Sequence, residues 1–444
     1  MTRYQADETQ VLGAASPTDL TRRDFLEKAV AGTASVLAPA LLLPGTARAA
    51  GRILKVGFVS PRTGPLAPFG EGDEYVIAAL KPMLARGIVV NGTTYPIQII
   101  AKDSQSNPNR ATEVASSLIK SDKVDLMLAA STADTVNPVA DQCELNRVPM
   151  VSTDCPWQPY YFGRGGKPDK GFDWTYHFFW GLEDVIAVFL NMWNSIPTNK
   201  VVGVLWPNDA EGNAFGDVKV GFPPALSKAG YRMIDGGRFP ASTADFTAQI
   251  NMFKRGGVEI LSGALTPPAF ATFWTQAAQQ GFRPKIASVA KGLLFPAAVQ
   301  SLGNRAIGLT TEVWWSPNHP YKSGLTGETA AQFCAAWEGA TNKPWTQPLG
   351  FRHALIEVAV DIFKRTRNLD SPDAIREAIR ATNYQSIVGP ISWSGSPVKN
   401  VTKTPLVGGQ WIAGKKFKHD LVIVNNDTEK TIPLQQKIIA LPQG

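Results

Sequence analysis

Short runs of β-branched residues alternate with longer amphipathic stretches from residue 53 onward, and this alternation limits the possible folds most strongly. Apolar runs predict strands, and apolar residues spaced three and four apart predict helices. Strands that alternate with helices form parallel sheets covered by helices. The first set has predicted strands at 53–59, 95–103, 126–129 and 150–152, and predicted helices at 72–84 and 110–121.

A Gly, Pro and aromatic segment at 156–174 interrupts the alternation, which then resumes. The second set has predicted helices at 184–193, 216–229, 247–255 and 268–280, and predicted strands at 200–206, 232–238, 260–262 and 285–288. Two consecutive sets predict an α/β fold with two similar lobes. After residue 307 we expect a strand at 308–313, helices at 328–341, 352–367 and 371–381 that could cover either lobe, and strand-like runs at 391–393, 407–412 and 421–424.

The bulk composition is that of a globular protein. The chain has 444 residues, of which 44% are hydrophobic and 18% charged, so it can bury a sizeable core. The net charge of +7 comes from scattered basic residues with no aromatic-plus-basic motif, so no nucleic-acid partner is expected. Neither a cofactor nor a metal site is predicted, because the cysteines lack CxxC spacing and the histidines lack HExxH spacing. Cys143 and Cys155 could form a disulfide or remain buried thiols.

The N-terminus has the order of an export signal. Arg22 and Arg23 precede Phe25 and Leu26, a mildly apolar stretch follows at 29–44, and Ala47-Arg48-Ala49 offers a small-residue cleavage site. The arginine pair predicts a twin-arginine type of signal peptide over residues 1–49. The apolar stretch is too weak for a membrane anchor. Cleavage would leave a soluble protein outside the cytoplasm.

The loop after the strand at 126–129 is a candidate ligand site. Ligands of parallel sheets bind at the carboxyl ends of strands, where helix N-termini present free amide groups. We expect the next helix to begin near Asn137 and Pro138, with Asp134, Thr135 or Asn137 as a possible N-cap that needs no ligand. The residues predicted to contact a ligand here are Ser131, Thr132, Ala133, Asp134 and Thr135.

Four segments together resemble the branched-chain amino-acid-binding family, the type I periplasmic binding proteins of ABC importers. Residues 56–67 read VGFVSPRTGPLA, like the opening strand and loop of that family. Residues 103–108 (DSQSNP), 129–138 (AASTADTVNP) and 148–153 (VPMVST) continue the likeness in order.

This resemblance implies two Rossmann-like lobes joined by three crossovers near residues 176, 308 and 389. Lobe 1 would comprise 52–175 plus 313–388, and lobe 2 would comprise 176–312 plus 389–444. The lobes would close over a small-molecule ligand, which an ABC permease at the membrane would then accept. The same lobes could instead serve a sensor or chemoreceptor.

The resemblance also implies further ligand contacts at strand ends. Ser152, Thr153 and Asp154 would form the second ligand-contacting turn, with Trp157 as a candidate apolar wall. Phe215 stands where the family commonly has a tyrosine, so it would keep ring stacking without the hydroxyl. The remaining candidates are Thr266, Lys291 and, among the tryptophans near strand ends or crossovers, Trp180; Trp206, Trp314 and Trp315 lie in similar positions.

Lys291 departs from the family pattern, in which amino-acid binders tend to have an acidic residue in this turn. A lysine facing the ligand predicts an anion without an amine, such as an aromatic or short-chain carboxylate. Two alternatives stay open: Lys291 could point to solvent, and Glu183 and Asp184 could supply the acidic partner that amino acids or amides need.

No catalytic motif points to an enzyme. The four histidines, His177, His319, His353 and His419, lie far apart, and no GxSxG or Walker loop follows a strand. The competing enzyme class is a secreted α/β hydrolase, in which Ser131, Asp134 and a distant histidine would have to meet in space.

Overall fold

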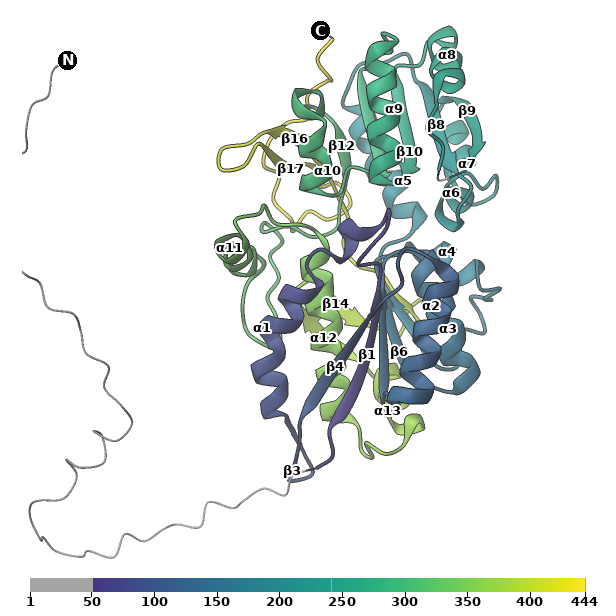
Figure 1. The fold of residues 1–444 in the computed structure, drawn as a ribbon. Coiled ribbons are helices and arrows are strands. Elements are labelled where there is room, and N and C mark those ends of the chain that lie inside the picture. The colour runs from purple at the N-terminus through teal and green to yellow at the C-terminus, as the bar shows by residue number, and fades with distance from the viewer. Residues whose placement is uncertain (1–50, 241, 444) are drawn as a thin grey trace, which may run out of the picture. The chain divides into compact units, whose positions relative to one another are not determined.

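A six-stranded parallel sheet forms the first lobe of the computed structural model, which describes residues 51–240 and 242–443 (Figure 1). Its strand order is β15-β7-β6-β5-β1-β4. Most of its central residues are buried because helices cover both faces. The strands are β1 (Leu54–Ser60), β4 (Ile97–Asp103), β5 (Leu126–Ala130), β6 (Met150–Thr153), β7 (Thr175–Phe178) and β15 (Val401–Thr402).

Two helix layers enclose this sheet. Helices α2 (Pro108–Ser117), extended by the single turn Leu118–Asp122, and α3 (Ala133–Asn146) pack on one face. Helices α1 (Asp73–Arg86) and α12 (Pro348–Arg365) pack on the other. The smaller elements of this lobe are the turn Ala67–Gly70, α4 (Trp157–Phe162), α11 (Ala330–Thr341), α13 (Pro372–Arg380) and the hairpins β2–β3 (Ile88–Val90, Thr93–Tyr95) and β13–β14 (Asn383–Ser386, Gly389–Ser392).

A seven-stranded sheet forms the second lobe, in the order β17-β16-β12-β11-β10-β8-β9. Its parallel strands are β8 (Val201–Pro207), β9 (Arg232–Phe239), β10 (Ile260–Leu265), β11 (Ile286–Lys291) and β12 (Thr310–Val313). The C-terminal strands β16 (Val407–Ala413) and β17 (His419–Asn425) add an antiparallel edge. The helices are α5 (Leu182–Asn194), α6 (Ala210–Phe215), α7 (Phe222–Lys228), α8 (Thr247–Gly256), α9 (Pro267–Gln279), α10 (Pro296–Ser301) and the turn Gly303–Ala306.

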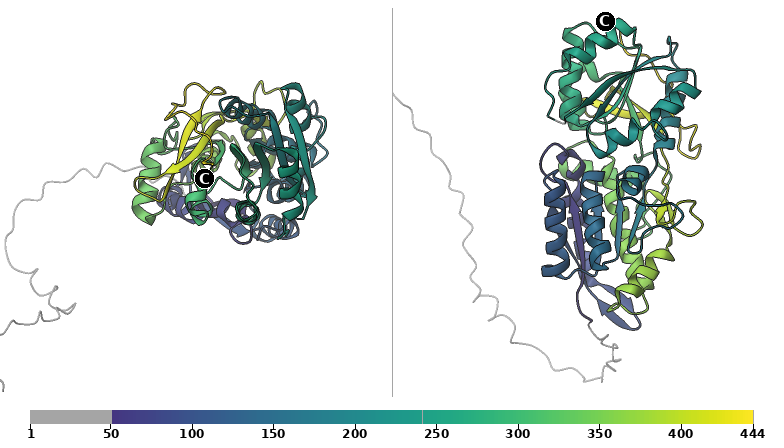
Figure 2. Two further views of the ribbon diagram at one scale, coloured as in Figure 1. Left: turned by 90° about the horizontal axis from the view of Figure 1, so that it is seen from above. Right: turned by 90° about the vertical axis from the view of Figure 1, so that its right-hand side faces the viewer.

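The expected fold class, two parallel-sheet lobes flanked by helices, is confirmed. Figure 2 shows both sheets between their helices. The chain passes between the sheets three times: after Phe178, after Val313 and after Thr402. The expected crossovers near 176, 308 and 389 differ because β7 and β15 complete the first sheet and β12 continues to Val313 in the second.

Two helix starts differ from expectation. Helix α3 begins at Ala133 instead of near Asn137, so Pro138 lies inside the helix and Thr132 takes the N-cap position. The predicted helix at 216–229 begins only at Phe222, because the Asp217 side chain accepts the backbone N–H groups of Lys219 and Val220 in a separate turn before it.

The predicted signal peptide, residues 1–49, lies outside the described residues. Within residues 51–240 and 242–443, no helix combines the length and apolar character that crossing a bilayer requires. Cys143 and Cys155 are buried free thiols, so the disulfide alternative does not apply.

Candidate functional site

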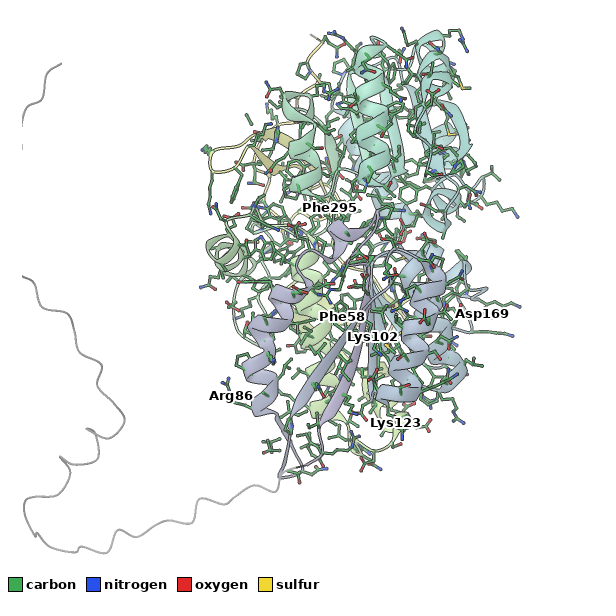
Figure 3. All side chains as sticks on the ribbon, in the orientation of Figure 1. Phe58, Arg86, Lys102, Lys123, Asp169 and Phe295 are labelled. Atoms are coloured by element: carbon green, nitrogen blue, oxygen red, sulfur yellow. The ribbon has the colours of Figure 1, made fainter. Side chains whose placement is uncertain are left out.

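The carboxyl ends of strands from both lobes meet around one small cavity. Residues that follow β6, β7 and β8 and residues at the ends of β11 and β12 line it. Figure 3 shows side chains filling the region between the sheets, where Phe295 of the second lobe meets Phe69 of the first with ring centroids 4.7 Å apart. The lining residues are Phe69, Asp154, Pro156, Phe179, Trp180, Glu211, Phe215, Ala290, Lys291, Leu294, Glu312 and Trp314.

The space left in this cavity is about 20 Å³, enough for a water molecule or two. A solute therefore cannot enter while the lobes stand as they do. Entry requires the strand ends of the two lobes to separate.

Lys291 ends β11 inside this cavity and is 6% exposed. Its Nζ lies 2.8 Å from Oε2 of Glu211 and 3.0 Å from Oδ2 of Asp209. Asp209 also caps helix α6 by accepting the backbone N–H of Gly212. Lys291 thus neither faces a ligand as a lone cation nor points to solvent, and the inference of an amine-free anion loses its premise.

On the second-lobe side of the cavity, carboxylates outnumber the single lysine. Burial alone would lower the pKa of Lys291, but the charges of Asp209 and Glu211 raise it above its ordinary value. Burial raises the pKa of Glu211 even beside Lys291, and it raises the pKa of Glu312 to about 7. The second-lobe side of the cavity is therefore neutral to negative in charge.

Asp154 belongs to a buried ion network beneath the cavity. Its Oδ2 accepts from Nη1 of Arg352 and from the Ser131 hydroxyl, 3.1 Å away. Nε of Arg352 also donates to Oδ1 of Asp73 over 2.6 Å, and the Ser60 hydroxyl donates to Asp73. This network fixes the Asp154 carboxylate, and its Oδ1 remains without a hydrogen-bond partner.

Within the described part of the chain, four buried polar atoms near the cavity lack a hydrogen-bond partner: Oγ1 of Thr132, Oδ1 of Asp154, Nε1 of Trp180 and Nε1 of Trp314. Three of these residues line the cavity itself. Buried polar groups are nearly always hydrogen-bonded, so these atoms are available to bond a polar molecule, water included, that enters the cavity. The set offers two N–H donors, one carboxylate acceptor and one hydroxyl.

The predicted site residues separate into three groups. Asp154, Trp180, Phe215 and Lys291 line the cavity. Around it, the Ala133 N–H donates to Glu211 across the lobes, and Asp134 lies near enough to Lys291 for their charges to interact. Four further residues form hydrogen bonds away from the cavity: Thr135 with Ser104, Ser152 with His177, Thr153 with the carbonyl of Phe178 and Trp157 with Glu183. Thr266 lies outside the lining, at the N-cap position of α9.

Glu183 and Asp184 do not supply the acidic partner that an amino acid or amide ligand would need. Both pair with Lys403 Nζ, at 2.9 Å and 2.7 Å, beside the first crossover. The acidic groups near Lys291 are instead Asp209, Glu211 and Asp134.

Several lining residues were missed from the sequence. Glu312 is the last residue but one of the predicted strand at 308–313, so the strand-end rule would also have selected it. Phe179 follows β7, a strand that the sequence reading did not place. No local pattern connects Arg352 with Asp73, because 279 residues separate them.

The hydrolase arrangement does not form. Ser131 contacts Asp154 and Arg352 instead of a histidine. Three of the four histidines bond buried serines: His177 with Ser152, His319 with Ser316 and His353 with Ser323. Burial also lowers the pKa of His177 and His319 to about 3, so both are weak bases at neutral pH.

Comparison with known proteins identifies the family. A model described as a periplasmic binding protein matches residues 53–416. The chain belongs to the periplasmic binding protein family. Members of this family bind solutes outside the cytoplasm, so the chain is an extracytoplasmic binding protein and not an enzyme.

Solved periplasmic binding proteins share this fold at low identity. A leucine-binding protein from Thermotoga maritima is 19% identical, with a TM-score of 0.68 over 84% of this chain and 99% of that chain. An ABC-transporter solute-binding protein from Rhodopseudomonas palustris, in complex with 3,4-dihydroxybenzoic acid, is 17% identical, with a TM-score of 0.67 over 88% and 99%. A branched-chain amino-acid-binding protein from Streptococcus pneumoniae, in complex with isoleucine, is 16% identical, with a TM-score of 0.65 over 84% and 99%.

Proposed function

We propose that this periplasmic binding protein captures a small solute between its lobes and delivers it to the permease of an ABC importer. The unpartnered polar atoms at the interlobe cavity carry the proposal, since bound solute would satisfy them. Because the cavity is small, loading requires the lobes to rotate apart about the three crossovers and then close. A sensor or chemoreceptor role would use the same cavity with a different membrane partner.

An ammonium-bearing solute of the amino-acid class agrees best with the charges. Asp209, Glu211 and Asp134 surround Lys291, and Asp154 presents a free carboxylate oxygen. An amine-free carboxylate would meet this negative surface without an unpaired cation to hold it. Aromatic acids remain the second candidate, because the cavity has aromatic walls and one relative is a complex with 3,4-dihydroxybenzoic acid.

An N-terminal export signal and a location outside the cytoplasm agree with this function. We propose that residues 1–49 form a twin-arginine signal peptide that exports the chain, on the strength of Arg22 and Arg23 and the small residues near Ala49.

A thermal-shift screen of amino acids, amides and aromatic acids tests the ligand class. Amino acids are expected to raise the melting temperature, because a ligand at 100 times its Kd adds about 2.7 kcal/mol to the free energy of unfolding. A shift produced only by amine-free acids would contradict the charge argument.

Calorimetry with the solute that raises the melting temperature then tests the site. Trp180→Phe removes an unpartnered N–H and keeps a smaller aromatic ring, so it is expected to weaken binding about tenfold. Trp345→Phe, which makes the same change outside the cavity lining, should leave affinity unchanged. Equal affinity in both variants would remove Trp180 from the site.

A further inference from the structure

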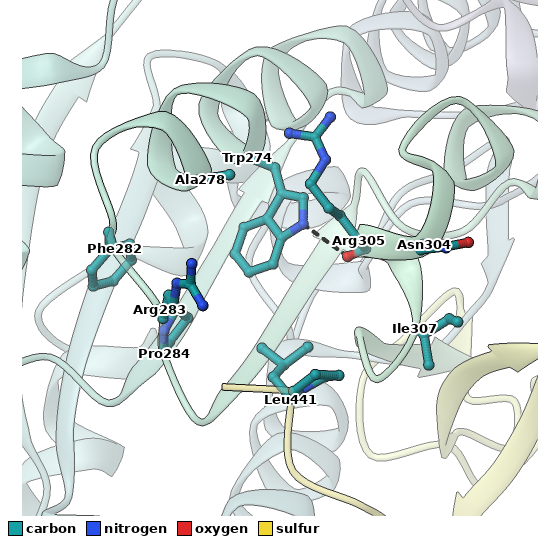
Figure 4. Close-up of a pocket in the computed structure, with 10 residues that line it drawn as sticks. Trp274, Ala278, Phe282, Arg283, Pro284, Asn304, Arg305, Ile307 and Leu441 are labelled. Atoms are coloured by element: carbon teal, nitrogen blue, oxygen red, sulfur yellow. Dashed lines mark hydrogen bonds between the residues drawn. The ribbon is translucent and has the colours of Figure 1, made fainter. Parts of the chain in front are cut away.

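We propose a second small-molecule site in the second lobe, specific for a compact apolar body that carries a carboxylate. Its basis is a cavity of about 310 Å³ between helix α9, the loop that leads to β11 and the C-terminal segment. Pockets that hold small ligands begin near this size. Figure 4 shows Trp274 near its centre, with Arg283 and Arg305 on opposite sides of the indole.

The walls of this cavity are apolar and fixed in place. Nε1 of Trp274 donates to the carbonyl of Arg305 over 2.9 Å, and the indole stacks with Phe270 at 5.7 Å between centroids. Phe282 and Leu441 are also buried, at 5% and 6% exposed. A flat or branched hydrocarbon group would bury its surface here against side chains that are already ordered.

Positive charge lies at the same cavity, on two exposed arginines for which residues 51–240 and 242–443 supply no acidic partner. The lining includes Arg283, Arg305 and Asn304 but no aspartate or glutamate. In the part of the chain described, neither guanidinium forms an ion pair; Arg283 donates to the carbonyl of Gln443 and Arg305 to the Thr275 hydroxyl. An arginine beside an apolar cavity binds a carboxylate through charge-assisted hydrogen bonds, which selects an amphipathic anion.

This site is separate from the interlobe cavity. Pro284 and Ile307, which line it, precede β11 and β12, whereas Lys291 and Glu312 at the other ends of those strands line the interlobe cavity. The six residues of β11 place the two sites about 20 Å apart. Leu441 also joins the site to the sheet, because its backbone N–H bonds the carbonyl of Lys285 over 2.8 Å.

Calorimetry with naphthalene-2-carboxylate on the purified protein tests the proposal. The wild type is expected to bind this probe, and the neutral analogue 2-naphthalenemethanol at least about tenfold more weakly. Arg283→Gln/Arg305→Gln should weaken the carboxylate about tenfold or more, and Ala278→Leu, which fills the cavity from the exposed face of α9, should also weaken it.

Matched controls separate this site from the solute site. Arg255→Gln removes an exposed arginine that lies outside the cavity lining and should bind the probe like the wild type, as should Trp180→Phe. Full probe affinity in Arg283→Gln/Arg305→Gln, equal affinity for the neutral analogue, or loss of binding in Trp180→Phe alone would overturn the proposal. The first two outcomes leave solute capture between the lobes untouched, whereas loss of probe binding in Trp180→Phe alone would place the aromatic acid in the interlobe cavity.

Discussion

Replacing Arg352 with methionine is expected to lower the free energy of unfolding by about 3–5 kcal/mol. The side chain is 2% exposed and supplies the single cation that two fully buried carboxyl groups, Asp73 and Asp154, share. Methionine fills a similar volume but leaves both charges without a cation in a low-dielectric interior. Urea unfolding of the variant and the wild type at pH 7 measures the difference.

The exposed ion pair between Arg110 and Glu113 supplies the control for this prediction. Its arginine side chain is 40% exposed, so Arg110→Met is expected to change stability by less than about 1 kcal/mol. The loss in Arg352→Met should also shrink at acid pH, because burial raises the pKa of Asp73 and Asp154 and protonation removes the unpaired charges. Equal stability of the two variants at pH 7 would show that the network does not hold the first lobe together.

The second large effect is expected for Lys291→Met, which should destabilise the protein by about 3 kcal/mol at neutral pH. Asp209 and Glu211 would then repel each other next to the cavity without a cation. Lys285→Met is the matched control, because Lys285 pairs with Glu259 at the surface with 40% of its side chain exposed. Thermal unfolding of both variants from pH 5 to pH 8 measures the effect.

The charges of Lys291 and Glu211 determine how the stability difference between Lys291→Met and the wild type depends on pH. The raised pKa of Lys291 stabilises the wild type at every pH below the ordinary lysine pKa, so that contribution is constant from pH 5 to pH 8. In Lys291→Met, Glu211 binds a proton more tightly folded than unfolded, so the deficit should shrink toward pH 5. A deficit that does not vary with pH would contradict the assignment of Glu211 as the buried partner.

Local patterns predicted the two lobes well, because hydrophobic periodicity directly reflects burial in a covered parallel sheet. Asp154 and Lys291 were predicted at the interlobe cavity because the carboxyl ends of parallel strands lie at one edge of a sheet. What the sequence could not show was the neutralisation of Lys291 by Asp209 and Glu211, although both precede the candidate Phe215, at the N-cap and in the first turn of α6. Their contact with Lys291 depends on how helix α6 meets the end of β11, which is a tertiary property.

The differences between the predicted and the observed helix starts and crossovers have local physical causes. Pro138 fitted the first turn of a helix, yet α3 begins at Ala133 and accommodates the proline in its interior. The crossovers were displaced because β15 has only two residues and β7 follows an irregular aromatic segment, so neither gives a clear period-two pattern. The network of Arg352, Asp73 and Asp154 joins distant parts of the chain and leaves no local pattern.

A crystal structure of the protein with the solute that raises its melting temperature tests the central claim most directly. We expect the solute between the lobes, hydrogen-bonded to Nε1 of Trp180 and to Oδ1 of Asp154, within a cavity larger than the present one. A solute found only on one lobe, for example beside Trp274, with the interlobe atoms still unpartnered, would contradict the account.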